Sequence, residues 1–266
     1  MNRSPVGIFD SGLGGLTVAR AIHRHLPGES TIYFGDTARV PYGPKSPDTV
    51  RRYSLEILDW LLGEGVKAVV VACNTSTAHA LEVLAARSPV PVLGVIEPGA
   101  RAAVRLSPHG PVGVIGTAGT VASGAYPRAL RALAPGVRVV QQACPLFVPL
   151  VEEGWFDHPA TDLVAREYLA PLLAEGIEAL VLGCTHYPLL ASVLSGVAGP
   201  EVTLVDSAEE TALALEGLLR HRNLTAPVDD PGPSHRYVVS DDPERFAAVA
   251  SRSLGERAGK AEVITW

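Results

Sequence analysis

Short apolar segments recur along this chain and alternate with segments of helical character. Residues 6–10, 68–73, 112–116 and 180–184 are four such runs, each bounded by polar or small residues. A run of this length between polar boundaries is typical of a strand buried on both faces of a sheet. Alternation of such strands with helices predicts mainly parallel sheets with helices on both faces, which is a three-layer α/β architecture.

The rest of the pattern continues this alternation. Further strands are expected at residues 31–36, 90–96, 137–141, 202–206, 235–240 and 262–265, and helices at 16–25, 47–62, 76–86, 125–134, 160–175, 187–194 and 208–221. The helix at 47–62 has Asp48 near its start and Gly63 at its end, which fits the capping preferences of helices. Residues 223–235 are rich in Pro, Asp and Gly and predict a loop.

A weak internal repeat divides the chain in two. Residues 6–12 resemble residues 112–118, and each segment precedes a cysteine-bearing strand by a similar interval. The same order of matches in both halves predicts two α/β lobes related by an approximate two-fold axis, with the crossover near residues 97–99. The expected domains are residues 1–97 plus 207–266 for the first lobe and residues 98–206 for the second.

Charge and composition argue against several classes of ligand and location. The net charge is −6, with 28 acidic against 22 basic residues, and no block of lysine and arginine stands out. This argues against nucleic acid as the main ligand. We see no apolar run of membrane-spanning length and no signal peptide, and three cysteines do not form a disulfide framework. We therefore expect a reduced, cytoplasmic protein with no membrane partner.

Two of the cysteines lie in near-matching frames. Cys73 and Cys184 each follow an apolar run and a small residue, and each precedes small polar residues. Both positions are at the carboxyl end of a predicted strand, where open parallel sheets place their ligand sites. Two equivalent thiols indicate chemistry that needs the same group twice. Cys144 has no polar companion, so it is expected to act as a small buried hydrophobe.

The same residues also allow a zinc site. Cys73, Cys184 and His186 would supply three ligands, but the close spacing of metal-binding cysteines and histidines is missing, so we expect no metal. Both cysteines precede predicted helices, and a helix N-terminus or a nearby histidine lowers the pKa of a thiol toward neutrality. Reactive thiols are therefore the preferred interpretation.

The segment Asp10 to Gly15 follows a strand and opens a helix. Such a turn directs backbone N–H groups at an anion, which makes it a candidate binding site. A tight turn that needs glycine for its dihedral angles explains the same residues. Asp10 is then a helix cap, and both interpretations remain open.

Two further segments carry polar groups that suit a site. Tyr42 and Gly43, in a loop after a strand, would present a phenol and backbone amides to a ligand, although a plain turn accounts for them as well. Glu152 and Glu153 offer carboxylates, for which a solvated surface is the ordinary location.

Taken in order, five segments resemble the glutamate racemases, within the wider aspartate/glutamate racemase family. They are residues 10–12, 41–43, 73–75, 143–154 and 183–188. The resemblance covers nearly the whole chain, up to at least residue 206. It implies two pseudo-symmetric α/β lobes with the active site in the cleft between them. It also implies a cofactor-independent enzyme that interconverts L- and D-glutamate and supplies D-glutamate for peptidoglycan biosynthesis.

The resemblance assigns roles residue by residue. Cys73 and Cys184 would be the two acid/base residues, with Cys73 deprotonating D-glutamate and Cys184 deprotonating L-glutamate. Asp10, Glu152 and His186 would assist them, Asp10 beside Cys73 and His186 beside Cys184. The substrate-binding residues would be Asp10, Ser11, Tyr42, Gly43, Asn74, Thr75, Thr185 and His186. Several members of the family are dimers, so a homodimer is a further expectation.

Racemisation itself explains why two thiols are needed. The reaction removes the proton on Cα and returns one to the opposite face, which two bases across a cleft can do by exchanging roles. No lysine lies in a comparable frame to hold a pyridoxal cofactor. The free-energy barrier to removal of the Cα proton must then be lowered by electrostatic stabilisation of the developing charge in a desolvated cleft.

Two other classes of function remain as alternatives. A cysteine hydrolase would use Cys184 as nucleophile, His186 as base and Glu152 to orient the base, and it would leave Cys73 without a role. A non-catalytic protein would bind glutamate without changing its optical rotation.

Overall fold

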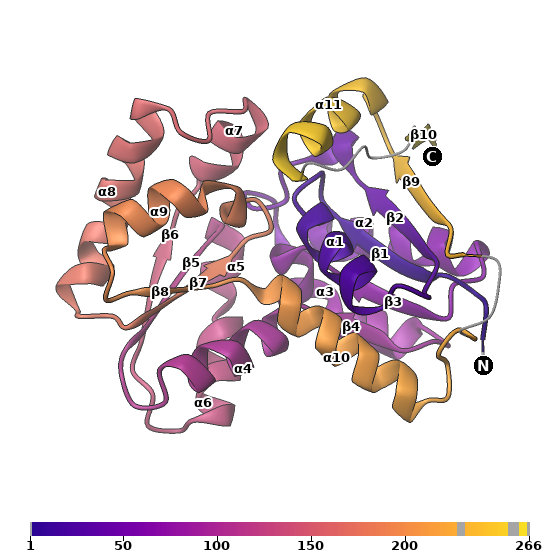
Figure 1. Cartoon of the computed structure of the whole chain (residues 1–266), viewed down its shortest axis with the longest axis horizontal. Coiled ribbons are helices and arrows are strands. Elements are labelled where there is room, and N and C mark those ends of the chain that lie inside the picture. Colours follow the sequence, from indigo (N-terminus) through magenta and orange to yellow (C-terminus); the bar gives the residue numbers. More distant parts are fainter. Residues whose placement is uncertain (1, 228–231, 255–260, 265–266) are drawn as a thin grey trace.

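Two parallel β-sheets organise the chain. The computed structural model describes residues 2–227, 232–254 and 261–264, and Figure 1 shows two α/β lobes side by side. The first sheet has the strand order β10-β9-β2-β1-β3-β4, with β1 (Val6–Asp10), β2 (Thr31–Gly35), β3 (Ala68–Val71), β4 (Val92–Gly94), β9 (His235–Val239) and β10 (Glu262–Val263). The second has the order β6-β5-β7-β8, with β5 (Val112–Gly116), β6 (Val139–Ala143), β7 (Ala179–Gly183) and β8 (Thr203–Val205).

The two sheets repeat one strand order, which confirms the predicted two-lobe α/β architecture. The order β2-β1-β3-β4 of the first sheet recurs as β6-β5-β7-β8 in the second. Val6 lies in register with Ala68, and Val112 with Ala179 in the same way. The strands that precede Cys73 and Cys184 therefore occupy equivalent places.

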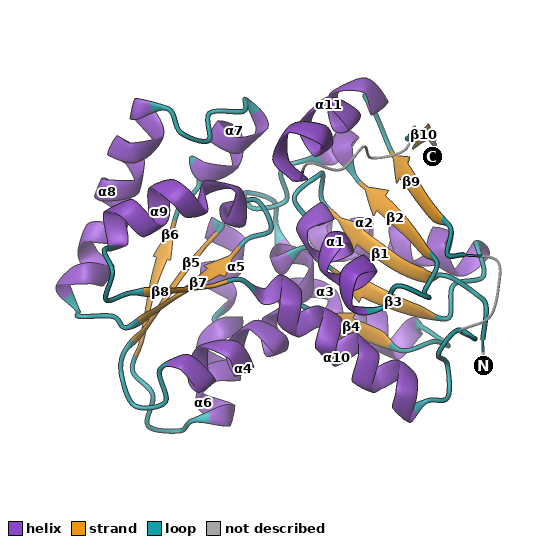
Figure 2. Ribbon diagram, in the orientation of Figure 1, coloured by secondary structure: helices purple, strands orange, loops and turns teal. Residues whose placement is uncertain are grey.

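Helices cover both faces of each sheet (Figure 2). They are α1 (Leu16–His25), α2 (Pro47–Gly63), α3 (Asn74–Arg87), α4 (Ile96–Leu106), α5 (Ala118–Ser123), α6 (Ala125–Leu133), α7 (Phe147–Glu152), α8 (Pro159–Ala174), α9 (Ala191–Ala198), α10 (Ser207–His221) and α11 (Pro243–Leu254), with short 3₁₀ turns η1 (Thr37–Arg39) and η2 (Tyr187–Leu190). In the first sheet Ile8 packs toward α1 and α10, while its neighbour Phe9 packs toward α2 and α3. In the second sheet Leu180 packs toward α8 and α9, and Val181 toward α4 and α6. Successive residues of a strand thus pack into the hydrophobic cores on opposite faces of the sheet, as the two-residue period of a strand requires.

The residues at which the crossover was expected, 97–99, lie in a helix. The strand predicted at 90–96 ends at Gly94, and α4 begins at Ile96. Pro98 and Gly99 lie in the first turn of α4, where the missing N–H of proline leaves no helical hydrogen bond unmade. A Pro–Gly pair is typical of a turn, so the local sequence does not indicate this helix.

Other predicted boundaries changed less. The single helix expected at 187–194 is split into η2 and α9, and α10 packs against both α1 and α4. Residues 228–231 of the expected loop and residue 265 of the last expected strand lie outside the described residues. In the part of the chain that the structure describes, no helix is long and apolar enough to cross a membrane.

Candidate active site

One small pocket lies where the two lobes meet. It is at the carboxyl ends of two pairs of equivalent strands, β1 with β5 and β3 with β7. It is lined by Ser11, Pro41, Tyr42, Gly43, Cys73, Asn74, Thr75, Thr117, Val148, Cys184, Thr185 and His186. Most of the site residues predicted from sequence are among them. Asp10 and Glu152 lie next to this lining, bonded to Thr185 and His186.

Cys73 is the residue at which β3 gives way to α3. It is the N-cap of α3, and its Sγ accepts a hydrogen bond from the Ser76 N–H at 3.4 Å. Burial, followed by the charge of Asp10, raises the pKa of Cys73 to about 11. The expectation of a lowered thiol pKa is therefore wrong for Cys73, because desolvation outweighs the helix N-terminus.

Cys184 follows β7 and has a different neighbour. Its Sγ lies 3.8 Å from His186 Nδ1, and His186 Nε2 lies 2.7 Å from Glu152 Oε1. Burial lowers the pKa of His186, but its bonds to Cys184 and Glu152 outweigh burial and hold that pKa well above its usual value. The raised pKa favours the protonated form of His186, in which both ring nitrogens are donors.

Asp10 closes β1 and is fully buried. Its Oδ2 accepts the Gly12 N–H at 3.0 Å, and its Oδ1 accepts the Thr185 hydroxyl at 3.1 Å. Burial raises the pKa of Asp10, against the opposing effects of His186 and the bound N–H groups. The expectation that this turn needs glycine for its dihedral angles is wrong, because no glycine among residues 12–15 has a positive φ. Asp10 is not the cap of α1 either, since the N-cap is Gly15 and it has no side-chain cap hydrogen bond. A Cβ on Gly14 would lie 2.6 Å from Thr185 Oγ1, so only glycine allows this approach of the lobes.

Tyr42 and Gly43 both line the pocket. The Tyr42 hydroxyl donates to Asp36 Oδ2, and the phenol is buried. Gly43 accepts the Gly119 N–H at 3.0 Å, and a Cβ on Gly43 would lie 2.7 Å from the Thr117 Cβ. The Gly43 backbone is therefore packed directly against the second lobe.

Thr117 is a pocket residue that sequence analysis missed. Its Oγ1 caps α5 and lies 2.9 Å from Thr75 Oγ1 across the lobe boundary. The signal was present in the internal repeat, which aligns Thr117 with Ser11. On the other side, Asn74 Oδ1 accepts a hydrogen bond from Tyr126, and Asn74 Nδ2 is buried with no partner among the described residues.

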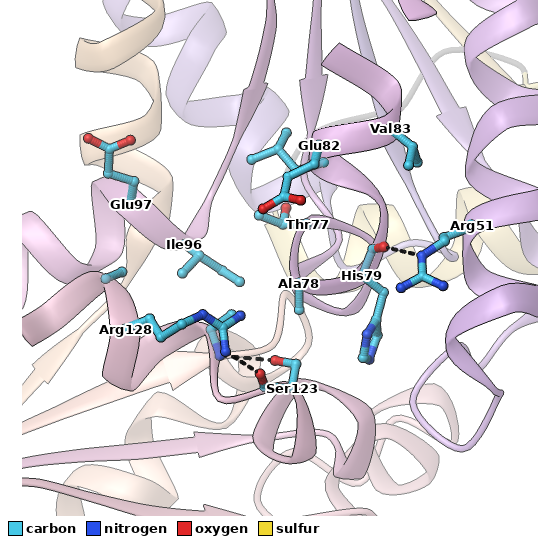
Figure 3. A pocket seen from close by; sticks show the side chains of 13 residues that line it. Arg51, Thr77, Ala78, His79, Glu82, Val83, Ile96, Glu97, Ser123 and Arg128 are labelled. Carbon is cyan, nitrogen blue, oxygen red and sulfur yellow. Dashed lines mark hydrogen bonds between the residues drawn. The ribbon is translucent and has the colours of Figure 1, made fainter. Parts of the chain in front are cut away.

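The lobes are closed over this site. The free space within the pocket is about 10 Å³, roughly enough for one water molecule. A larger cavity of about 630 Å³ lies between α3 and α4–α6. Figure 3 shows its lining, with Arg51 bonded to the His79 carbonyl and Arg128 to Ser123. No site residue predicted from sequence lines that cavity, so size alone does not mark the site.

The third cysteine lies apart from this chemistry. Cys144 is buried in the core of the second lobe, and its Sγ donates to the Gln142 carbonyl at 3.6 Å. Cys73, Cys144 and Cys184 are all free thiols. Among the residues described, no three His, Cys, Asp or Glu side chains gather so that they could hold a metal ion.

Known proteins resemble this chain over almost its whole length. The sequence profile of the Asp/Glu/Hydantoin racemase family matches residues 14–215. The glutamate racemase of Geobacter metallireducens is 56% identical over 254 residues, covering 96% of this chain and 94% of the relative. The crystal structure of a glutamate racemase isoform from Bacillus anthracis superposes with a TM-score of 0.95 at 41% identity, covering 100% of this chain and 98% of that one.

A third relative was solved with a ligand. It is the glutamate racemase of Francisella tularensis in complex with D-glutamate, with a TM-score of 0.92 at 34% identity, covering 100% of this chain and 98% of that one. The two solved structures cover the whole of this chain, and the Geobacter relative covers 96% of it. The chain therefore belongs to the Asp/Glu/Hydantoin racemase family and, within it, to the glutamate racemases.

Proposed function

We propose that this enzyme interconverts L- and D-glutamate without a cofactor, by proton transfer at Cα between Cys73 and Cys184. The observation that carries the proposal is the pair of free thiols at equivalent strand ends, both lining one pocket. The relatives that bear the name glutamate racemase, one of them solved with D-glutamate, support the choice of substrate.

The proton balance requires one thiolate and one thiol. The thiolate takes the Cα proton from one face, which leaves a planar carbanion whose charge spreads into the α-carboxylate. The thiol then gives its proton to the opposite face and becomes the thiolate. Each turnover exchanges the two roles, and no group is consumed.

The neighbours of the two thiols favour one charge arrangement at rest. His186 Nδ1 lies 3.8 Å from Cys184 Sγ, and the raised pKa of His186 favours a positive charge beside that sulfur. Cys73 has a raised pKa and keeps its proton. This arrangement suits the removal of a proton from L-glutamate by Cys184 and delivery by Cys73, with Asp10 assisting Cys73 and Glu152 holding His186.

The remaining lining would hold the substrate. Ser11, Asn74, Thr75 and Thr185, together with the Tyr42–Gly43 backbone, offer hydrogen-bonding groups to the two carboxylates and the ammonium group. We add Thr117 to this set because it lines the same pocket. Preorganised polar groups of this kind also stabilise the charge that develops in the transition state.

Glutamate cannot enter a space of about 10 Å³, so we propose that the lobes separate to admit it. The moving units would be residues 1–97 plus 207–266 and residues 98–206. Helices α4 and α10, which pack against each other, lie at the two connections between these units.

The resemblance carries three broader proposals. The D-glutamate formed would supply peptidoglycan biosynthesis, the enzyme would work in the cytoplasm, and it would form a homodimer. Sedimentation analysis of the purified protein tests the last of these, since a monomer at all concentrations would contradict it.

Circular dichroism tests the main proposal. Purified enzyme with L-glutamate and no added cofactor should bring the optical signal to zero, and the reaction run in D₂O should place deuterium at Cα of both enantiomers. L-Aspartate should react far more slowly. A cysteine hydrolase built on Cys184, His186 and Glu152 would instead form an acyl-enzyme and leave the optical signal of glutamate unchanged.

A further inference from the structure

We propose that Tyr126 is a positioning residue, which fixes the side-chain amide of Asn74 so that its NH₂ group faces the substrate. The two residues come from different lobes, since Tyr126 lies on α6 and Asn74 is the first residue of α3. The Tyr126 hydroxyl donates to Asn74 Oδ1 at 2.7 Å. The inference rests on the proposed function because it names how one pocket residue recognises glutamate.

A side-chain amide has an acceptor end and a donor end, and its orientation decides which end a ligand meets. Asn74 lines the pocket and is 3% exposed. Because the phenol occupies Oδ1, Nδ2 is the end left buried and unpaired among the described residues. A buried donor without a partner is costly unless an acceptor arrives. The acceptor that fits is a carboxylate oxygen of the substrate, whereas a rotated amide would point Oδ1 at that carboxylate and repel it.

Tyr126 itself is held firmly in place. Its side chain is fully buried, and a Cβ on Gly183 would lie 2.9 Å from Tyr126 Cε2. A Cβ on Gly99, in the crossover helix, would lie 3.4 Å from the Tyr126 hydroxyl. The ring is therefore packed between the residue that precedes Cys184 and the helix that joins the lobes.

The hydroxyl of Tyr126 also keeps its proton throughout the working pH range. Burial, followed by the charges of Asp206 and Cys184, raises the pKa of Tyr126 far above its usual value. A protonated phenol is a donor, so it selects the carbonyl end of the Asn74 amide. The phenol thus acts on the substrate only through Asn74.

A double-mutant cycle separates this role from simple packing. Tyr126→Phe should raise KM for both glutamate enantiomers about tenfold, the scale of one hydrogen bond to a charged group, with a smaller change in kcat. Asn74→Ala should have at least the same effect. Tyr126→Phe added to Asn74→Ala should change nothing further, because the residue through which it acts is gone.

Tyr187→Phe is the matched control. Tyr187 is an equally buried phenol in the second lobe, but its hydroxyl donates to the Cys144 carbonyl at 2.9 Å and not to Asn74. Its effect should be the same factor in the wild-type and Asn74→Ala backgrounds. If Tyr126→Phe also behaves in this additive way, or leaves KM unchanged, the positioning role is overturned.

Titration calorimetry with racemic glutamate gives the same cycle as binding affinities, since turnover leaves a racemic mixture unchanged. It tests the positioning role even if wild-type enzyme fails to racemise glutamate, an outcome that would refute only the proposed function. Absence of binding by the wild type would overturn both. If Tyr126→Phe does not fold, the side-chain NH₂ resonance of Asn74, identified by its loss in Asn74→Ala, should shift when D-glutamate is added. No shift in that resonance would overturn the proposal.

Discussion

Cys73 and Cys184 occupy equivalent places in the two lobes but lie in opposite electrostatic surroundings. Cys73 lies near the buried Asp10, and burial with that negative charge raises the pKa of the thiol to about 11. Cys184 faces His186, whose own pKa is raised well above its usual value by Cys184 and Glu152 despite burial. The repeated fold gives the two sulfur atoms equivalent positions, while the residues around them differ in charge.

This difference suits a reaction that needs an acid and a base at once. Two identical surroundings would favour two thiols or two thiolates, and neither pair can both remove and deliver a proton. The positive charge favoured on His186 lies beside one sulfur, and the Asp10 carboxylate lies near the other, so the two thiols have unequal surroundings.

Replacing either cysteine is the strongest test of the difference between Cys73 and Cys184. Cys73→Ser and Cys184→Ser should each reduce racemisation about a thousandfold, because a serine hydroxyl is far too weak an acid to replace a thiol. Cys144→Ser, at the buried thiol outside the pocket, is the control for the loss of a cysteine and should stay within a few fold of wild type.

Deuterium wash-in at Cα tells which face each sulfur serves. Cys73→Ser should still exchange L-glutamate without inverting it, and Cys184→Ser should still exchange D-glutamate. The ratio kcat/KM cannot show this, since the two enantiomers have equal free energy and both directions must slow equally. Wild-type exchange from both enantiomers in either variant would refute the two-base mechanism.

Neutralising the carboxylate behind His186 should have the next largest effect. Glu152→Gln should lower kcat about ten- to hundredfold and move the alkaline limb of the pH–rate profile to lower pH. The sign follows because the Glu152 charge raises the pKa of His186, so its loss lets His186 give up its proton at a lower pH.

Glu153→Gln is the neighbouring control. Glu153 is 69% exposed, and its carboxylate lies 3.4 Å from Arg245 rather than beside His186. It should leave both kcat and the alkaline limb in place. An unshifted limb in Glu152→Gln would mean that the His186 cation is not required.

The smallest expected effect is on the reactivity of Cys73. Asp10→Asn removes a charge that raises the pKa of Cys73, so the thiolate fraction at pH 8 should rise up to about tenfold, which corresponds to about one pKa unit. Mass spectrometry of the Cys73 peptide after brief iodoacetamide treatment measures this, with the Cys184 peptide as internal reference. An unchanged or slower alkylation of Cys73 would contradict the influence of Asp10.

Much of the fold was predictable from the sequence because its strands are short, apolar and bounded by polar residues. β1 and β5 begin and end where the sequence predicted. Helix α4 was missed because its Pro98 and Gly99 suggest a break, although the first helical turn tolerates both. Helix α7 was missed because it is a single short helix with Pro149 inside its span.

The internal repeat made part of the site predictable from the sequence. The matching frames led to Cys73 and Cys184, and the same repeat contained Thr117, which aligns with Ser11. The link between Tyr126 and Asn74 had no such signal, because it joins residues 52 positions apart in different lobes. The direction of the Tyr42 phenol toward Asp36 and the raised pKa of Cys73 depend on packing, which no local pattern records.

The closed pocket has a consequence for the stability of the molecule as a whole. Its lining comes from both lobes, with Asn74 on one and Thr185 on the other. Under the proposed function, a glutamate bound to both would act as a reversible cross-link between them. The free energy of binding would then add to the free energy of unfolding. The substrate is in this sense a part of the structure during each turnover.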